Sequence, residues 1–341
     1  MSDVRIRPAG GPTTLAEVAR LAGVSVATAS KALTGRHHVA SATRERVMDA
    51  AKKLDFTPNQ SARNLLEGRT GTVGLLASDL EGRFMIPVLA GAEDAFGTGS
   101  VNVFLCDARG DAVREQHHLR ALLNRRVDGI IVVGDTTNPR PSLGQKLPVP
   151  VVYAYAPSDD PSDISVVPDN VGGSKLAVEH LIAVGRRKIA HISGDPTYAA
   201  ARDRALGFDE GMLAANLEQV AAPLFGTWSE KWGRDATTIL LRSNPEVDGI
   251  VAASDQIARG VLDTLRDLGR SVPKDVSVIG YDNWEVLAAN ARPELTSIDS
   301  DLEQVGRIAA LRVFEAIDGA ALRSTTEAQP ARLVMRSSTV A

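Results

Sequence analysis

Several polar and aromatic side chains in the second half of the chain lie where they could bind a small molecule. Asp282, in the tetrapeptide Gly-Tyr-Asp-Asn, directly follows a predicted strand, where a carboxylate faces the crevice of an open α/β sheet. Arg204, in Arg-Ala-Leu-Gly-Phe, would begin a helix and offer planar, bidentate hydrogen bonds to a polyol or an anion. Trp228 lies in an irregular segment and could stack on a sugar ring. Ser254 ends another predicted strand, beside Asp255.

Each of these residues also has a purely structural interpretation. An Asp that follows a strand is often the N-cap of the next helix, which would account for Asp282 and Asp255. Trp228 could equally be packed in a hydrophobic core. The sequence alone leaves both interpretations open.

Motifs for catalysis or metal binding are missing from the sequence. The six histidines form no His-Glu-x-x-His pattern and none pairs with a cysteine, so neither a metal site nor a cofactor is expected. There is no Walker loop, no Gly-x-Ser-x-Gly elbow and no Gly-x-Gly-x-x-Gly after a strand. A sugar-metabolising α/β enzyme with a helical appendage remains the alternative to a binding protein, because carboxylates, Ser254 and histidines are all present.

The composition limits the class of protein. A chain of 341 residues that is 44% hydrophobic and 23% charged is typical of two or three globular domains. The single cysteine, Cys106, excludes a disulfide framework and fits a reducing compartment. The first residues contain no apolar run resembling a signal peptide, and no stretch reaches the roughly 18 apolar residues of a membrane span. We expect a cytoplasmic protein with no membrane association.

The charge is unevenly distributed along the chain. Residues 1–69 carry eleven Lys and Arg against six Asp and Glu, whereas the remainder carries 27 against 36. A basic first part on an acidic body favours a polyanion as the partner of the first part.

The elements that would hold such a partner are three short helices. Thr14 opens the first with a glutamate three residues later, which is the pattern of a capping box, and Gly23 can adopt the left-handed conformation that ends it. Ser25 caps a second helix, over about residues 26–33, and a third follows within 43–56. Because only a short turn separates the first two, the segment predicts a helix-turn-helix unit.

The second helix carries short side chains that suit the major groove of DNA. Val26 and Ala27 could approach base edges and contact thymine methyl groups. Thr28 and Ser30 suit phosphate oxygens, and Lys31 can reach a phosphate or a guanine edge. A helix packed tightly on a neighbour would also have short side chains, and other positions of the same helix suit that role.

From Thr72 onward, apolar strands alternate with helices. We expect buried parallel strands in two series. The first series is 72–78, 101–107, 128–134 and 150–155, and the second is 188–194, 248–254 and 275–282. Val-Asp-Gly-Ile occurs once in each series, at 127–130 and 247–250. The alternation predicts two similar doubly wound lobes with a ligand in the cleft between them.

Several segments, in order, resemble the LacI/GalR family of bacterial transcription repressors, over almost the whole chain. They are TLAEVARLAGVSVATASKALTG, TRERVMDAAKKLDFTPNQSARNL, RALGF, ASDQIARGVLDTLRDLG, SVIGYDN and LTSID. The resemblance implies an all-α helix-turn-helix domain and an α/β body like a periplasmic binding protein, with two doubly wound parallel sheets. It also implies a homodimer whose affinity for operator DNA is switched by a small molecule. A sugar or sugar phosphate is the expected effector, and a purine-like ligand is the second choice.

The resemblance further assigns residues. Val26, Ala27 and Lys31 fall on base-contacting positions, and Leu65, in a short helix after Pro58, falls on the leucine that wedges between central base steps. A linker helix that only covers the body is the alternative for Leu65. The implied DNA-binding set is Thr14, Ser25, Val26, Ala27, Thr28, Ser30, Lys31, Asn59 and Leu65. The implied effector-binding set is Asp79, Phe84, Arg204, Trp228, Ser254, Asp255, Asp282 and Ser300.

The expected organisation follows from these assignments. A flexible tail over 1–12 precedes the helix-turn-helix domain, 13–58, the hinge helix and linker, 59–70, and the effector-binding and dimerisation domain, 71–341. The N-lobe is expected at about 71–170 plus 298–325, and the C-lobe at about 171–297 plus 326–341. No leucine-heptad segment follows the expected last strand, so a dimer on a two-fold palindrome is expected rather than a tetramer. Two departures from the family pattern, Ala29 for valine and Ala40 for serine, affect helix packing and capping rather than DNA contacts.

Overall fold

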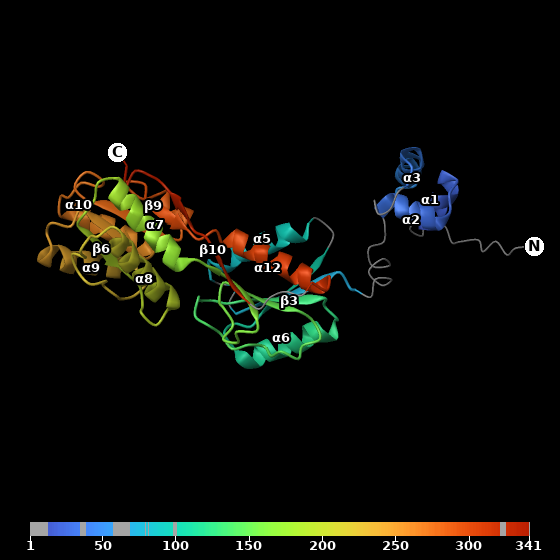
Figure 1. The fold of residues 1–341 in the computed structure, drawn as a ribbon, viewed down its shortest axis with the longest axis horizontal. Helices are drawn as coiled ribbons and strands as arrows, with labels where there is room; N and C mark the ends of the chain where they lie inside the picture. Colours follow the sequence, from blue (N-terminus) through green and yellow to red (C-terminus); the bar gives the residue numbers. More distant parts are fainter. Residues whose placement is uncertain are drawn as a thin grey trace, which may run out of the picture. The chain divides into compact units, whose positions relative to one another are not determined.

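The chain forms two compact units in a computed structural model, Met1–Arg69 and Thr70–Ala341 (Figure 1). The residues described are 13–34, 39–56, 69–78, 80, 82–97, 101–320 and 325–340. Within these ranges no helix is long and apolar enough to cross a membrane.

The first unit contains the three predicted helices, α1 (Leu15–Ala22), α2 (Val26–Thr34) and α3 (Ser41–Lys53). The capping box is present: the Glu17 carboxylate accepts hydrogen bonds from the backbone N–H and the hydroxyl of Thr14, at 2.8 and 2.9 Å. Gly23 ends α1 in the left-handed conformation, with φ 66°. These local interactions fix the short turn before α2.

A small core of alanine and valine side chains joins the three helices. Val18 of α1, Ala29 of α2 and Val47 of α3 are fully buried in it. Ala29 therefore packs inside the core in spite of its small size. Ala40 is the N-cap of α3 and makes no side-chain cap hydrogen bond, which agrees with the loss expected from its missing hydroxyl.

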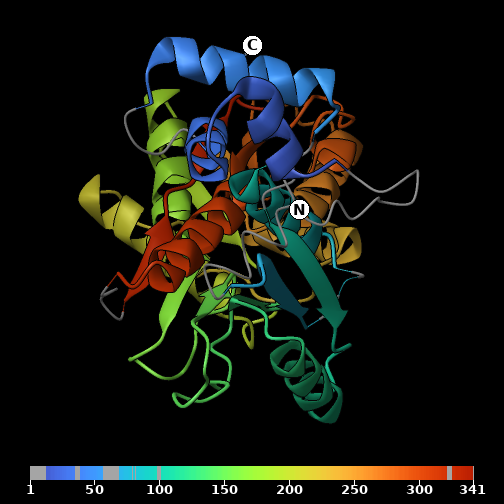
Figure 2. The same ribbon diagram turned by 90° about the vertical axis from the view of Figure 1, so that its right-hand side faces the viewer.

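The first lobe of the second unit is a six-stranded parallel sheet in the order β10-β5-β4-β3-β1-β2. Its strands are β1 (Thr72–Ala77), β2 (Asn102–Asp107), β3 (Gly129–Val133), β4 (Val151–Ala154), β5 (Ile164–Pro168) and β10 (Thr326–Gln329). Helices α5 (Met85–Phe96) and α12 (Leu302–Ile317) cover one face, and α6 (Ala112–Asn124), at the lower edge of Figure 2, covers the other.

Helices α5 and α12 approach each other unusually closely. A Cβ atom on Gly91 of α5 would lie 1.7 Å from the Glu303 carbonyl oxygen, and one on Gly306 of α12 would lie 1.9 Å from the Val88 carbonyl oxygen. Both positions therefore require glycine, since any side chain would force the helices apart.

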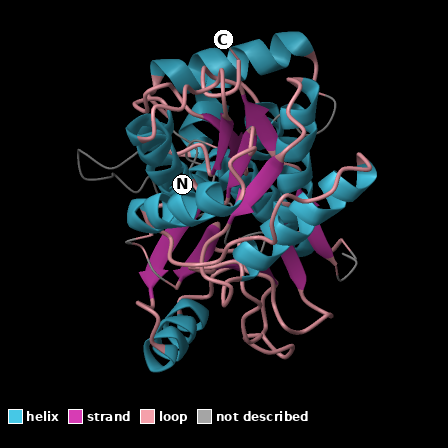
Figure 3. Ribbon diagram, turned by 90° about the vertical axis from the view of Figure 1, so that its left-hand side faces the viewer, coloured by secondary structure: helices cyan, strands magenta, loops and turns pink. Residues whose placement is uncertain are grey.

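The second lobe is a five-stranded sheet in the order β11-β9-β8-β7-β6, in which only β11 is antiparallel. Its strands are β6 (Ile189–Ile192), β7 (Gly249–Ala252), β8 (Ser277–Tyr281), β9 (Thr296–Asp299) and β11 (Arg332–Val334). Its helices are α7 (Asn170–Ala183), α8 (Ala199–Ala214), α9 (Glu230–Ser243), α10 (Asp255–Asp267) and the short α11 (Glu285–Ala288). Helices α7 and α8 pack on one face and α9 and α10 on the other, so helices enclose the strands (Figure 3).

Three segments cross between the lobes: β5 to α7, β9 to α12 and β10 to β11. The fold class expected from the sequence is confirmed, but two boundaries are wrong. Strand β10 was assigned to the C-lobe, whereas Thr326–Gln329 pairs with β5 in the first sheet. The end of β9 was assigned to the N-lobe, whereas Ile298 and Asp299 pair with β11 in the second sheet.

Strand β2 is not buried as predicted. It is an edge strand, and Phe104 and Leu105 are 40% and 46% exposed. An apolar run can indicate a buried strand or a strand that another surface covers, and the sequence cannot distinguish the two.

The repeated tetrapeptide has the same structural role in both lobes. The Asp128 carboxylate accepts hydrogen bonds from the backbone N–H groups of Thr70, Gly71 and Thr72, at 2.8, 2.6 and 3.1 Å. The Asp248 carboxylate accepts from those of Arg187 and Lys188, at distances from 2.8 to 3.1 Å. Each Asp therefore anchors the chain where it enters the first strand of its lobe.

Asp128→Ala is expected to lower the free energy of unfolding by about 1.5 to 3 kcal/mol, because it leaves three backbone donors without their charged acceptor. Chemical denaturation measures this change. Asp248→Ala is the matched comparison and should cost a similar amount. A change below about 0.5 kcal/mol in both variants, the size typical of a surface substitution, would show that the anchors are dispensable.

Candidate effector cleft and DNA-contacting helix

A cavity of about 460 Å³ lies between the two lobes. Its wall contains both charged residues and five aromatic rings. The lining residues are Gly82, Arg83, Phe84, Asp135, Thr136, Thr137, Tyr155, Tyr198, Ala200, Arg204, Trp228, Gln256, Asp282 and Trp284. Its size and composition are those of a small-molecule binding site.

The fold brings these residues together because parallel strands end at the same edge of a sheet. In the first lobe, Arg83 and Phe84 lie in the segment between β1 and α5, Asp135 follows β3, and Tyr155 follows β4. In the second lobe, Asp282 directly follows β8. The cavity therefore lies outside the carboxyl ends of the strands, as is usual for open α/β sheets.

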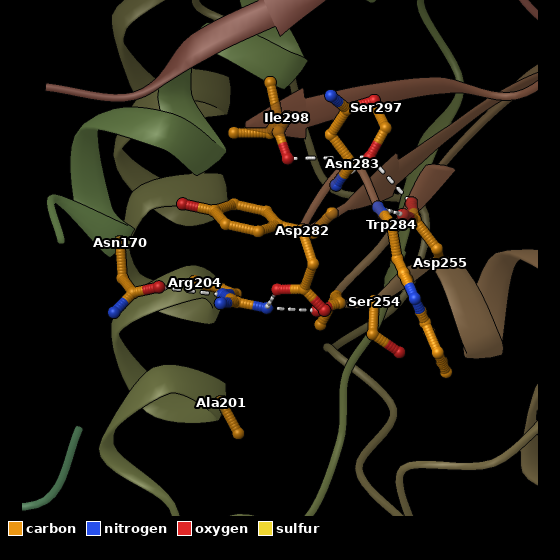
Figure 4. A network of polar contacts seen from close by, with 12 residues as sticks. Asn170, Ala201, Arg204, Ser254, Asp255, Asp282, Asn283, Trp284, Ser297 and Ile298 are labelled. Carbon is orange, nitrogen blue, oxygen red and sulfur yellow. Dashed lines mark hydrogen bonds and ion pairs between the residues drawn. The ribbon is translucent and has the colours of Figure 1, made fainter. Parts of the chain in front are cut away.

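Asp282 and Arg204 form the buried centre of the second lobe's wall (Figure 4). Arg204 Nη1 lies 3.2 Å from Asp282 Oδ1, and both side chains are 5% exposed. Arg204 also donates to Asn170 Oδ1, at 2.9 Å, and to the Ala253 carbonyl oxygen, at 2.5 Å. Its guanidinium lies 3.6 Å from the centre of the Tyr281 ring. Four contacts thus hold Arg204 in one position.

A second guanidinium reaches Asp282 from the first lobe. Arg83 Nη2 lies 2.5 Å from Asp282 Oδ2. The Arg83 guanidinium also lies 4.5 Å from the ring centres of both Phe84 and Trp284. Asp282 therefore has an arginine on each of its oxygens, one from each lobe.

The remaining wall supplies aromatic faces and unpaired polar atoms. Phe84 and Tyr155 are stacked, with ring centres 5.4 Å apart, and Tyr198 contacts Trp228 edge to face at 6.0 Å. Trp228 Nε1 and Thr137 Oγ1 are buried and have no hydrogen-bond partner among the residues that the structure describes. A buried polar group without a partner is costly, so these two atoms are candidate contacts for ligand hydroxyl groups.

Three predicted effector residues do not line the cavity. Ser254 is the N-cap of α10 and accepts a hydrogen bond from the Ile257 N–H at 3.2 Å. Asp255 is fully buried behind the wall, and Ser300 is buried where the chain leaves β9 for α12. Ser254 is therefore a capping residue, whereas neither Asp255 nor Asp282 is the N-cap that the structural interpretation expected. Asp255 serves the cavity only indirectly.

Asp255 holds the segment that carries the cavity residues Asp282 and Trp284. Its carboxylate accepts hydrogen bonds from the Trp284 N–H and the Ser297 hydroxyl, both at 2.6 Å. Burial, and then the charge of Asp282, raise the pKa of Asp255 to about 7.

Of the predicted effector residues, Phe84, Arg204, Trp228 and Asp282 line the cavity. Asp79 lies outside the described residues. The sequence analysis missed Arg83, Tyr155, Tyr198 and Trp284. Tyr155 is the last residue of the predicted strand 150–155. Applying to every strand end the rule used for Asp282 would therefore have found it.

The predicted DNA-contacting residues lie mainly on the N-terminal part of α2. Val26 is 48% exposed, and Ala27 and Lys31 are also exposed. Ser25 caps the helix by accepting a hydrogen bond from the Thr28 N–H at 3.1 Å, and the two hydroxyls lie 2.8 Å apart. The exposed side of α2 thus offers small side chains in its first turn and a lysine in its last turn.

The other predicted DNA-contacting residues are placed as follows. The Thr14 hydroxyl is bonded to Glu17 in the capping box. Ser30 is partly buried on α2. Asn59 and Leu65 lie outside the described residues.

Comparison with known families gives two matches. Residues 14–59 match bacterial regulatory proteins of the lacI family, and residues 178–339 match a periplasmic binding protein-like domain.

Curated relatives match over nearly the full chain. The transcriptional regulator CelR of Thermobifida fusca is 34% identical over 95% of this chain and 96% of its own length. The PurR repressor of Aliivibrio fischeri is 31% identical over 95% of this chain and 98% of its own length. The ribose operon repressor of Halalkalibacterium halodurans is 29% identical over 96% and 97% of the two chains.

Solved structures agree. A CelR–cellobiose complex is 31% identical, with a TM-score of 0.63, and covers 96% of this chain and 99% of its own. The lac repressor dimer bound to operator and an anti-inducer is 27% identical, with a TM-score of 0.68, over 97% and 100% of the two chains. The sugar-metabolising enzyme considered from the sequence is thereby excluded. The chain belongs to the LacI family of DNA-binding transcriptional regulators, non-enzymatic proteins with a periplasmic-binding-protein-like domain for a small-molecule effector.

Proposed function

We propose that the protein is a repressor of carbohydrate-metabolism genes whose affinity for a palindromic operator is switched by a sugar in the interlobe cavity. The observation that carries the proposal is the cavity wall itself. It combines aromatic faces, a carboxylate and an anchored guanidinium, which together suit the apolar faces and the hydroxyl groups of a sugar. Such a regulator acts in the cytoplasm, where its operator is.

The charges in the cavity favour a neutral sugar over a sugar phosphate. Among the described residues of the wall, Arg83 and Arg204 are balanced by Asp135 and Asp282. Both guanidiniums already contact Asp282, so the site has no excess positive charge for a phosphate. The cellobiose bound by CelR supports a neutral saccharide, and a purine stacked on the aromatic rings is the second choice.

For DNA binding, we propose that α2 lies in the major groove. Val26, Ala27 and Lys31 are exposed on it and would contact base edges, with Thr28 and Ser30 facing phosphates. The further assignments of Thr14 and Ser25 to the DNA-binding set, and of Asn59 and Leu65 to a hinge helix, rest on the family resemblance.

We also propose a homodimer, in which a second copy covers the exposed face of β2 and α5. A groove there is lined by apolar side chains that include Leu89, Val101 and Leu105. Ile86 is 60% exposed beside it. An apolar surface of this kind on a globular protein indicates an interaction site. The lac repressor structure, a dimer on its operator, supports a second copy as the occupant.

The switch requires the sugar to bind one state of the dimer better than the other, since equal affinity for both states would shift nothing. Asp282 and Arg204 are the residues whose contacts with the sugar would differ between the two states of the dimer. They lie in the second lobe, and the cavity is completed only when the first lobe faces them.

Asp282→Asn and Arg204→Lys should retain operator binding and respond only to effector concentrations ten to a hundred times higher. Losing a charged hydrogen-bond partner of a ligand costs about 1.5 to 3 kcal/mol. Titration of cellobiose and other neutral sugars against the protein–operator complex measures the midpoint. Arg266→Ala, on the exposed part of α10, is the control. An unchanged midpoint in both variants would place the effector elsewhere.

Leu65→Ala should weaken operator binding by a few kcal/mol and reduce DNA bending, with sugar binding unchanged, because an inserted side chain kinks the duplex. Leu66→Ala, the neighbouring leucine, is the matched control. Fluorescence anisotropy and circular-permutation gel shifts measure affinity and bending. If Leu65→Ala shows wild-type operator affinity and wild-type DNA bending, Leu65 is not inserted between base steps.

Leu105→Asp should convert the dimer into monomers, because it places a charge in the apolar groove. Analytical ultracentrifugation measures the state of association. Leu213→Asp changes another exposed leucine, 77% exposed on α8 and outside the groove, and should remain dimeric. A monomeric or tetrameric wild-type protein contradicts the proposal.

A further inference from the structure

Arg83 connects the two lobes across the mouth of the effector cavity. It lies in the segment that precedes α5 of the first lobe, and its partner Asp282 follows β8 of the second. Among the ion pairs of the described residues, this pair alone joins the lobes. Asn138 makes a second, uncharged connection, to the Thr197 carbonyl oxygen at 3.3 Å and the Ala199 N–H at 2.5 Å.

The guanidinium of Arg83 makes contacts of the kind that a bound sugar would make. It lies between two aromatic rings, Phe84 of the first lobe and Trp284 of the second, at 4.5 Å from each ring centre. It also makes a charged hydrogen bond to the carboxylate that we assign to sugar hydroxyls. Aromatic faces with a carboxylate at their edge are the contacts that a sugar would use in the same place.

The two arginines on Asp282 differ in how firmly they are held. Arg204 is 5% exposed and is anchored by Asn170, the Ala253 carbonyl group and the Tyr281 ring. Arg83 is 23% exposed, and besides Asp282 it contacts the rings of Phe84 and Trp284. A ligand that needs an oxygen of Asp282 would therefore displace Arg83 and leave Arg204 in place.

We propose that Arg83 is an interlobe latch, which competes with the effector for Asp282 and so sets the sugar concentration at which the regulator responds. The proposal rests on the proposed function in one respect, the use of Asp282 by the effector. The latch holds the ligand-free lobes together. Only protein with the latch open can bind the sugar. The apparent dissociation constant is therefore the intrinsic constant divided by the fraction of protein in which the latch is open. A latch closed for about nine-tenths of the time raises it about tenfold.

The first arm of the test needs no ligand. The substitutions Val113→Cys on α6 and Leu213→Cys on α8, at positions 80% and 77% exposed, place one label on each lobe in a Cys106→Ser background. Cys106 is the single cysteine of the chain. Single-molecule energy transfer should show a wider interlobe distance distribution in Arg83→Ala and Arg83→Gln than in wild type. Arg266→Ala, which removes an exposed arginine within the second lobe, should match wild type. Unchanged distances in both Arg83 variants would overturn the latch.

The second arm is calorimetric titration with cellobiose. We expect Arg83→Ala to bind about tenfold more tightly than wild type, and Arg83→Lys to lie between them. Weaker binding by Arg83→Ala would overturn the latch, because Arg83 would then be a ligand contact. Wider lobes in Arg83→Ala with no cellobiose binding by any variant would support the latch and contradict the choice of this sugar. The experiments can therefore contradict the latch and the choice of sugar effector independently of each other.

Discussion

The proposed effector site depends on a buried carboxylate held between two guanidiniums. Removing Asp282 from water is costly unless opposite charges and hydrogen bonds compensate for it, and Arg204 and Arg83 supply that compensation. Arg204 is itself fixed by Asn170 at the start of α7 and by the carbonyl group of Ala253 at the end of β7. Contacts to this one carboxylate, direct or through Arg204, thereby fix the relative positions of α7, α8, β7 and β8. These elements in turn determine the shape of the cavity wall.

A second carboxylate, Asp255, lies behind the first and has a different role. It binds the backbone of Trp284 and the hydroxyl of Ser297, so it fixes the segment 282–284 rather than the ligand. Its pKa is raised to about 7 by burial and by the charge of Asp282, against the lowering effect of the hydrogen bonds from Ser297 and Trp284 and, to a smaller extent, of the charge of Arg83. Native Asp255 therefore keeps its proton well above the pH at which the unfolded chain releases it, and this contribution to stability falls as the pH rises from about 4 to about 7. Displacement of Arg83 therefore removes a positive charge from the surroundings of both Asp282 and Asp255.

Sequence patterns identified the parts of the fold that local interactions decide. The capping box at Thr14, the left-handed Gly23 and the short side chains of α2 depend on neighbours within a few residues, and the helix-turn-helix followed from them. The lobe that receives β10 and the exposure of β2 depend on pairing and on partners far along the chain, so no local pattern contains them. Arg83 was missed for the same reason, since its partner is 199 residues away. Ser254 and Asp255 lie at the predicted strand end but outside the cavity wall: Ser254 caps α10, and the Asp255 carboxylate accepts hydrogen bonds from Trp284 and Ser297. A polar residue after a strand can cap a helix, hold a neighbouring segment or contact a ligand, and the local sequence does not distinguish these roles.

The neighbour of Asp282 ties the cavity to the segments that cross between the lobes. Asn283 Nδ2 donates to Asp299 Oδ2 at 3.2 Å, at the end of β9 where the chain turns toward α12. Asp299 also pairs with Arg332 at 3.0 Å, at the start of β11 just after another crossing. The crossings from β9 to α12 and from β10 to β11 therefore each have one end in a single hydrogen-bond network, and this network includes Asn283, the residue beside Asp282. A ligand that replaces Arg83 changes the contacts of Asp282 next to these crossings, where a small rotation of the chain changes the angle between the lobes. The proposed ligand site and two of the segments that cross between the lobes therefore contain adjacent residues. A ligand that binds one lobe arrangement better than another could act through these neighbours, without a long coupling pathway.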